Sequence, residues 1–194
     1  MMIAFSGKQR SGKDTLAAFF VNEKNFRKIS FASDLKDRAR KAFDLNFYDE
    51  SIKEEYRDVL QDFGKICRRV DENFLIKPVL DHVFRKPDNY VLTDLRFQNE
   101  AKALRKRSWK LIRLEVPREV RSKRGILSHE NNVSETDLDR WDDWDVVVCD
   151  DGSLKTSEVA EAIYTALKIG SRATIHNASG KVVVTYQTQK TTPN

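Results

Sequence analysis

The chain has 194 residues, a length that suits one domain with at most a small appendage. Its 40% of hydrophobic and 34% of charged residues predict a soluble globular protein and exclude a disordered one. No apolar run approaches the ~20 residues needed to cross a bilayer, so we expect no membrane span. The first residues lack the charged n-region and the long h-region of a signal peptide, so we expect none.

Strands and helices alternate in the first half of the chain. In chain order we expect a strand over residues 2–6, a helix over 13–21, a strand over 26–31, a helix that ends near 43 and a long helix over 52–70. Ser33 or Asp34 is the expected cap of the second of these helices. A further helix after Asp71 contains Pro78, which should kink it or delay its start.

The alternation continues in the second half. We expect a strand over residues 90–93, a helix over 99–107, strands over 109–116 and 144–148, and a helix over 153–167. The segment 117–133 is polar, basic and without periodicity, which predicts a mobile lid. This order predicts an α/β fold, a doubly wound parallel sheet of about five strands with helices on both faces.

The end of the chain has a different pattern. Residues 172–177 and 181–187 alternate like two strands joined through residues 178–180, which predicts a C-terminal β-hairpin. We therefore expect a main domain over residues 1–169 and a hairpin extension with a frayed tail over residues 170–194.

The strongest motif is G-x-x-x-x-G-K, which runs from Gly7 to Lys13 between the first strand and the first helix. In this context the backbone N–H groups of the turn converge on a phosphate, and the lysine adds a mobile positive charge. The alternative is a glycine turn that opens an ordinary helix. A P-loop of this kind assigns ATP binding to Gly7, Arg10, Ser11, Gly12, Lys13, Asp14 and Thr15.

A magnesium site is expected beside this loop. Asp14 stands where a P-loop usually has the Ser or Thr that holds Mg²⁺, and its carboxylate could hold the ion through water. The apolar strand that ends at Asp94 resembles a Walker B strand, although a plain strand end or helix cap would give the same pattern. We predict that Asp14 and Asp94 are the metal residues.

Several arginines follow at places where a kinase needs positive charge. Arg96 lies two residues after Asp94, and Arg118 and Arg121 lie in the expected lid. Cations aimed at both substrates lower the barrier to phosphoryl transfer. We predict catalytic roles for Lys13, Arg96, Arg118 and Arg121, while each lid arginine taken singly could be a solvated surface charge.

Other candidate groups lack matching partners. Cys67 and Cys149 lie far apart in the sequence and have no metal-ligand spacing. Two such cysteines do not make the disulfide scaffold of a secreted protein, so we expect the protein to be located in a reducing cytoplasm. His129, Glu130 and Glu135 could form a metal or acid–base site, but no further ligand has a matching position. Glu135 is better interpreted as part of the start of a helix.

A series of motifs, in chain order, matches one family. The pieces are residues 6–15, 31–36, 57–64 with Arg69 and Phe74, 93–101, 128–130 with Glu135, and 150–154. The specific ones are Gly-Lys-Asp-Thr at the end of the P-loop and the run Thr-Asp-x-Arg-x-x-x-Glu from residue 93. With these motifs the chain resembles the deoxynucleoside monophosphate (dNMP) kinases of tailed bacteriophages.

The resemblance implies an adenylate-kinase-like fold and the reaction ATP + dNMP → ADP + dNDP with Mg²⁺. It implies that the dNMP is bound by Asp34, Lys36, Arg57, Gln61, Gly64, Arg69, Phe74 and Arg96. The chain departs from the family pattern in three places. Gly64-Lys65 stands where the family often has Gly-Thr. The family also has a tryptophan near the position of Phe74. Arg118 is shifted from the position of the arginine that usually closes its strand.

We expect the partners to be small molecules, ATP and a dNMP, and the location to be the cytoplasm, or the host cytoplasm if a phage encodes the chain. A homodimer is compatible with the sequence. Another small phosphorylated acceptor, phosphomevalonate or dephospho-coenzyme A, stays open. The net charge of +5 also permits a nucleic-acid-binding P-loop protein or a polynucleotide 5′-kinase, but no helix-turn-helix or zinc spacing supports nucleic acid as a partner. An inactive ATP-binding module is a further alternative.

Overall fold

The computed structural model describes residues 1–128, 130–153, 155–170 and 184–186. The chain divides into two compact units, Met1–Lys28 with Asn89–Asn194, and Ile29–Asp88. We call them the P-loop unit and the helical unit. The alternation of strands and helices along the chain does not reveal this division.

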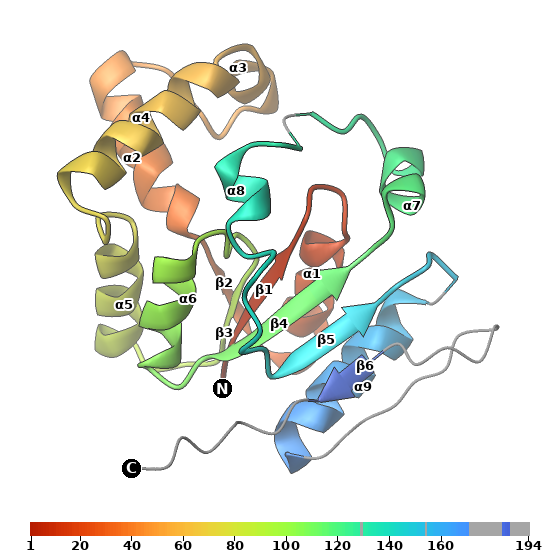
Figure 1. The fold of residues 1–194 in the computed structure, drawn as a ribbon. Coiled ribbons are helices and arrows are strands. Elements are labelled where there is room, and N and C mark those ends of the chain that lie inside the picture. Colours follow the sequence, from red (N-terminus) through yellow and green to blue (C-terminus); the bar gives the residue numbers. More distant parts are fainter. Residues whose placement is uncertain (129, 154, 171–183, 187–194) are drawn as a thin grey trace. The chain divides into compact units, whose positions relative to one another are not determined.

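The P-loop unit contains the sheet (Figure 1). Its strands, together with β2 at the boundary, are β1 Met2–Gly7, β2 Arg27–Ile29, β3 Tyr90–Leu92, β4 Lys110–Glu115, β5 Val146–Cys149 and β6 Val184–Tyr186. Its helices are α1 Lys13–Lys24, α6 Gln98–Arg105, α7 Arg118–Lys123, α8 Val133–Thr136 and α9 Thr156–Ile169. The helical unit consists of α2 Phe31–Phe43, α3 Glu50–Glu55, α4 Arg57–Val70 and α5 Ile76–Arg85.

The strand order is β2-β3-β1-β4-β5-β6, with β1 in the middle of the sheet. β1 pairs in parallel with β3 and β4, and β4 pairs in parallel with β5. Helices cover both faces of this parallel sheet (Figure 1), so the predicted doubly wound α/β fold is confirmed. In such sheets the strand order reverses at a point where ligands bind, outside the carboxyl ends of the strands. Here that point lies at the end of β1, where the P-loop follows.

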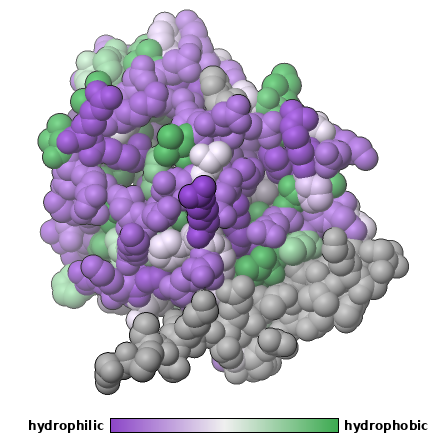
Figure 2. Space-filling model, viewed as in Figure 1, coloured by the Kyte–Doolittle hydropathy of each residue, from purple (hydrophilic) through white to green (hydrophobic). Residues whose placement is uncertain are grey.

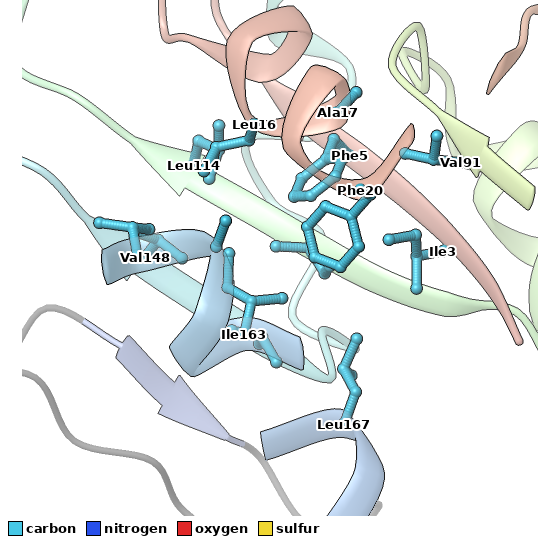
Figure 3. Close-up of a cluster of buried hydrophobic side chains, with 14 of the residues drawn as sticks. Ile3, Phe5, Leu16, Ala17, Phe20, Val91, Leu114, Val148, Ile163 and Leu167 are labelled. Carbon is cyan, nitrogen blue, oxygen red and sulfur yellow. The ribbon is translucent and has the colours of Figure 1, made fainter. Parts of the chain in front are cut away.

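The core on one face of the sheet explains the apolar strands (Figure 3). Ile3 and Phe5 of β1 pack with Leu16, Ala17 and Phe20 of α1 and with apolar residues of α9, all buried. The rings of Phe5 and Phe20 lie 5.8 Å apart between centroids. Because each fully buried side chain of this size contributes about 1.5–3 kcal/mol, the cluster holds the start of α1 firmly against β1.

One helix start differs from the prediction, and another agrees with it. Ser30, rather than Ser33 or Asp34, caps α2, because its hydroxyl accepts a hydrogen bond from the N–H of Ala32 at 3.1 Å. The helix with Pro78 starts only at Ile76, so the proline lies in the first turn, where its missing N–H costs nothing.

Two other segments also differ. The long helix expected over residues 52–70 is two helices, α3 and α4, which meet at Tyr56 with φ −107° and ψ 27°. Asp49 starts α3 by accepting the N–H groups of Ser51 and Ile52. The segment expected to be an aperiodic lid contains the six-residue helix α7, which is too short to show a hydrophobic period.

The expected hairpin falls mainly outside the described residues. Its first strand, residues 172–177, and its turn are not described, whereas residues 184–186 of the second strand form β6. β6 pairs antiparallel with β5, with Val146 opposite Tyr186. The surface visible in Figure 2 is mostly hydrophilic, and in the described part of the chain no helix has the length and apolarity to span a membrane.

Candidate active site

The loop between β1 and α1 has the geometry of a phosphate cradle. A β-carbon on Gly7 would lie 2.7 Å from Ser11 Oγ and 2.8 Å from the Leu114 carbonyl oxygen, so only glycine fits there. Gly12 has φ +90°, a left-handed conformation that glycine adopts without strain. The loop thus turns sharply between the end of β1 and the start of α1, the place where a helix can bind a phosphate.

Lys13 folds back over this loop. Its Nζ donates to the carbonyl oxygens of Gly7 at 2.7 Å and Lys8 at 2.9 Å and to Ser11 Oγ at 3.2 Å. The residue is only 7% exposed. Burial, followed by the positive charge of Arg96, lowers the pKa of Lys13 to about 7, while Glu135 acts in the opposite direction. A phosphate could replace the loop carbonyls as the partner of this ammonium group.

Asp14 is brought to the end of β3. Its side chain is 72% exposed and its Oδ1 accepts hydrogen bonds from Lys28 Nζ at 2.6 Å and Thr93 Oγ1 at 3.0 Å. Loss of part of its hydration raises the pKa of Asp14, but these hydrogen bonds and the charge of Lys28 outweigh that effect and lower the pKa below its usual value. Asp94, half-buried, follows Thr93 directly. One predicted metal residue, Asp14, is therefore hydrogen-bonded to the residue that directly precedes the other, Asp94.

Such an arrangement suits Mg²⁺ better than a metal that needs a full protein cage. Among the residues that the structure describes, no three His, Cys, Asp or Glu side chains gather as a metal site. Mg²⁺ keeps several waters and needs only one or two carboxylates beside the substrate phosphates. The exposed, ionised Asp14 fits that role.

Arg96 reaches the P-loop from the segment after β3. Its NH1 donates to the carbonyl oxygen of Gly7 at 3.3 Å and to Oε1 of Glu135. Its backbone N–H and that of Phe97 donate to Oε2 of the buried Glu100, at 2.9 and 3.0 Å. Lys13 and Arg96, which lie far apart in the sequence, thus meet at one carbonyl group.

The two lid arginines share one carboxylate. Arg118 Nε and Arg121 NH2 donate to the two oxygens of Glu130, at 2.9 and 3.0 Å. The hydrogen bonds from Arg118 and Arg121 lower the pKa of Glu130. Arg121 is buried and also donates to the carbonyl oxygen of Gln9 in the P-loop at 3.2 Å, whereas Arg118 is exposed.

Acidic residues that the sequence reasoning did not place in the site surround these cations. We call residues 130–139 the acidic segment. Besides Glu130, it contains Glu135, which accepts the Gln9 N–H at 2.8 Å, and Asp139, which binds Lys8 at 2.8 Å and Arg113 at 2.9 Å. The sequence had pointed to Glu130 and Glu135 only as motif pieces and as a weak metal or acid–base candidate, and it gave no signal for Asp139.

Two cavities open at this end of the P-loop unit. One, of about 270 Å³, lies beside Ser11, Gly12 and Thr15 and is closed by Arg124 and Asp150. Arg124 donates to the Arg10 carbonyl oxygen at 3.3 Å and to Asp150 at 2.9 Å. A larger cavity of about 430 Å³ is lined by residues that include Lys8, Arg113, Arg121, Glu115, Cys149 and Asp151.

The residues expected to bind a dNMP lie in the helical unit, apart from Arg96. They are Asp34 and Lys36 on α2, Arg57, Gln61, Gly64 and Arg69 on α4, and Phe74 before α5. Several have local partners. Asp34 pairs with Arg38, whose guanidinium lies 4.6 Å from the centre of the Phe74 ring, and Lys36 Nζ lies 5.1 Å from the centre of the Tyr48 ring.

Gly64 has a packing role of its own. A β-carbon there would lie 3.2 Å from Leu35 Cδ2 and 3.2 Å from Arg68 NH1. The close approach of α2 and α4 therefore accounts for this glycine without a ligand. Arg69 is exposed, and within the described part of the chain it makes no ion pair.

Comparisons with known proteins find a viral relative and solved kinase structures. Over 184 residues the chain is 27% identical to a protein named "Putative deoxynucleotide monophosphate kinase" from Acanthamoeba polyphaga mimivirus, covering 80% of this chain and 91% of that protein. A sugar kinase from Janibacter sp. HTCC2649 superposes with a TM-score of 0.50 at 15% identity, covering 87% of this chain and 94% of that one. Shikimate kinase from Aquifex aeolicus vf5 gives 0.49 at 18% identity, covering 88% and 98%.

A family is shown by the sequence itself. Residues 5–110 match the model of the family described as phosphomevalonate kinase. That range includes the P-loop, Asp94, Arg96 and the whole helical unit, and it is more than half of the 194 residues. The chain belongs to the phosphomevalonate kinase family.

Proposed function

We propose that this protein transfers the γ-phosphate of ATP to the phosphate group of a deoxynucleoside monophosphate. The observation that carries the proposal is the meeting of Lys13 and Arg96 at the Gly7 carbonyl, in the loop that leads into α1. Two cations beside the amino end of a helix form a site for a polyphosphate.

ATP binds along the P-loop in this proposal. The N–H groups from Arg10 to Thr15 cradle the phosphates, and Lys13 exchanges its loop carbonyls for phosphate oxygens. The adenine occupies the cavity of about 270 Å³ beside Thr15 and Arg124. Asp14 and Asp94 hold Mg²⁺, which supplies charge neutralisation to the phosphates when it is bound.

The chemical step needs no strong base. An oxygen of the acceptor phosphate, already an anion, forms a bond to the γ-phosphorus, and the bond from that phosphorus to the bridging oxygen of ADP breaks. Negative charge spreads over the transferred group, so alignment and positive charge lower the barrier. Arg96 neutralises the phosphates. Arg118 and Arg121 neutralise the transferred group as well, once their hydrogen bonds to Glu130 have broken.

The acceptor is bound by residues of the helical unit. Two features support this. Arg69 is an exposed cation, and Arg57 Nε is buried without a hydrogen-bond partner among the described residues. An arginine commonly binds a phosphate through two parallel N–H···O hydrogen bonds from one guanidinium group. The name of the mimiviral relative supports a deoxynucleotide as the acceptor.

A second acceptor has a specific observation in its favour. The family model that matches residues 5–110 bears the name phosphomevalonate kinase. Phosphomevalonate is also a small phosphate ester, and the same cradle and arginines would serve it. The two candidates differ in the group that carries the phosphate. In a deoxynucleotide this group is a sugar with a base, and in phosphomevalonate it is a short carboxylic acid.

The test is ADP production from ATP and Mg²⁺ with an acceptor panel. The panel holds dAMP, dGMP, dCMP, dTMP, dUMP, the matched ribonucleotides and phosphomevalonate, beside a reaction without acceptor. Turnover with one or more deoxynucleotides is expected. Turnover with phosphomevalonate alone would replace the proposed acceptor, and ATP binding without any turnover would contradict a kinase for these acceptors.

A further inference from the structure

Glu135 makes two contacts that link the acidic segment to the centre of the P-loop. Its Oε2 accepts the backbone N–H of Gln9 at 2.8 Å, and its Oε1 accepts NH1 of Arg96. The side chain of Glu135 is only 11% exposed. A carboxylate with so little water around it is costly to bury unless it accepts charge-assisted hydrogen bonds, and both of its oxygens accept one.

Arg96 is consequently held at both ends. Glu100, buried in the first turn of α6, accepts the N–H of Arg96 and fixes the backbone. Glu135 fixes the guanidinium, whose remaining contact in this group is the Gly7 carbonyl at 3.3 Å. An arginine side chain has many rotamers, and such a second anchor removes most of this freedom before a substrate binds.

We propose that Glu135 is a positioning residue that holds the Arg96 guanidinium beside Gly7, where it can neutralise a substrate phosphate. This inference rests on the proposed function, in which Arg96 touches a phosphate, while Glu135 acts only through Arg96. The short helix α8 thereby becomes part of the site although it carries no phosphate-binding group of its own.

A double-mutant cycle tests this role. Glu135→Gln keeps the shape of the side chain but removes its charge, and we expect it to lower kcat by about tenfold with a smaller change in the KM for ATP. Arg96→Ala should lower kcat further. The double variant should match Arg96→Ala alone, because a positioning residue has nothing left to position. Losses that multiply in the double variant would overturn the proposal.

Two controls separate positioning from other effects. Glu119→Gln, on the exposed face of α7, removes the same charge elsewhere and should leave kcat unchanged. Thermal unfolding of every variant shows whether the fold is kept. If Glu135 merely competed with substrate phosphates, Glu135→Gln would tighten ATP binding and leave kcat unchanged or raise it, and this result would also overturn the proposal.

A second readout does not depend on turnover. Glu135 accepts NH1 of Arg96 and should restrict the motion of the guanidinium. In Glu135→Gln the NMR order parameter of the Arg96 Nε–H group, assigned by the loss of its signal in Arg96→Ala, should therefore fall. An unchanged order parameter would overturn the proposal. Silence of the wild-type enzyme with every acceptor would instead be a failure of the proposed function, and this NMR experiment would still judge Glu135.

Discussion

The two edges of the sheet in the P-loop unit each contain a buried carboxylate among cations. At the amino edge, Asp145 accepts hydrogen bonds from Arg105, from Lys110 at 3.2 Å and from the Leu111 N–H at 2.8 Å. At the carboxyl edge, Glu135 accepts Arg96 and the Gln9 N–H. Both clusters are well paired, yet only one lies beside a phosphate cradle.

The difference lies in what a ligand could replace. Arg105 and Lys110 are paired with aspartates of the protein itself, and the Leu111 N–H belongs to strand β4. These partners are charged side chains rather than loop carbonyls, so the amino-edge cluster is a fixed part of the fold. At the carboxyl edge, Lys13 binds loop carbonyls and a hydroxyl, which a phosphate can outcompete as partners of an ammonium group. In the proposed function, similar charge clusters therefore serve stability at one edge and binding at the other.

The largest effect on stability should come from the amino edge. Asp145→Ala removes the acceptor of three donors, one of them a buried backbone N–H, and should lower the free energy of unfolding by about 3 kcal/mol. Urea denaturation measures this loss. Asp143→Ala is the matched control, since Asp143 pairs with the same Arg105 but is 54% exposed, and it should cost under ~1 kcal/mol. Equal losses in the two variants would contradict the comparison.

The opposite pattern is expected for Lys13. Lys13→Ala should lower kcat by about a hundredfold or more, because the cation that binds the transferred phosphate is gone. Its melting temperature should stay near that of the wild type, since removal of a buried charge also removes its desolvation cost. ADP production and circular dichroism on the same sample check both parts. Near-native turnover in folded Lys13→Ala would refute the assignment of Lys13.

A smaller effect, with a definite sign, should appear in the pH dependence of ATP binding. The pKa of Lys13 is about 7, so its ammonium group is charged below that pH and neutral above it. If the charged form is the one that binds phosphate, ATP affinity should fall by about tenfold between pH 6 and pH 8. Calorimetric titration at three pH values measures it.

Lys13→Arg is the control for this pH effect, because arginine stays charged throughout the range and leaves only the titration of ATP itself. The arginine variant should therefore lose the fall in affinity. The same fall in both proteins would assign the pH dependence to another group.

Much of the fold could be predicted from residue patterns. Apolar strands, the P-loop at the first strand–helix junction and the alternation of elements led to the doubly wound sheet, because each is a local pattern with a definite period. Element boundaries were less certain. Ser30 instead of Ser33 or Asp34 caps α2, and Tyr56 interrupts a helix, because caps and breaks depend on single side-chain contacts rather than on a period.

The candidate site could be predicted only in part. Lys13, Asp14, Arg96 and Arg121 were named from the sequence, and the structure places all four at the P-loop or in contact with it. Glu135 was interpreted as a helix start, which it is, but its contact with Arg96 joins residues 39 positions apart. No spacing rule reports such a contact.

The sequence by itself predicted the P-loop, since two glycines and a lysine at this spacing between a strand and a helix are typical of a phosphate-binding turn. The tertiary structure alone decided which charges meet. It put Glu135 beside Arg96 at the P-loop and Asp145 beside Arg105 and Lys110, and it lowered the pKa of Lys13 through burial and the neighbouring Arg96. Electrostatic interactions depend on distance and on the exclusion of water, and both are properties of the folded chain.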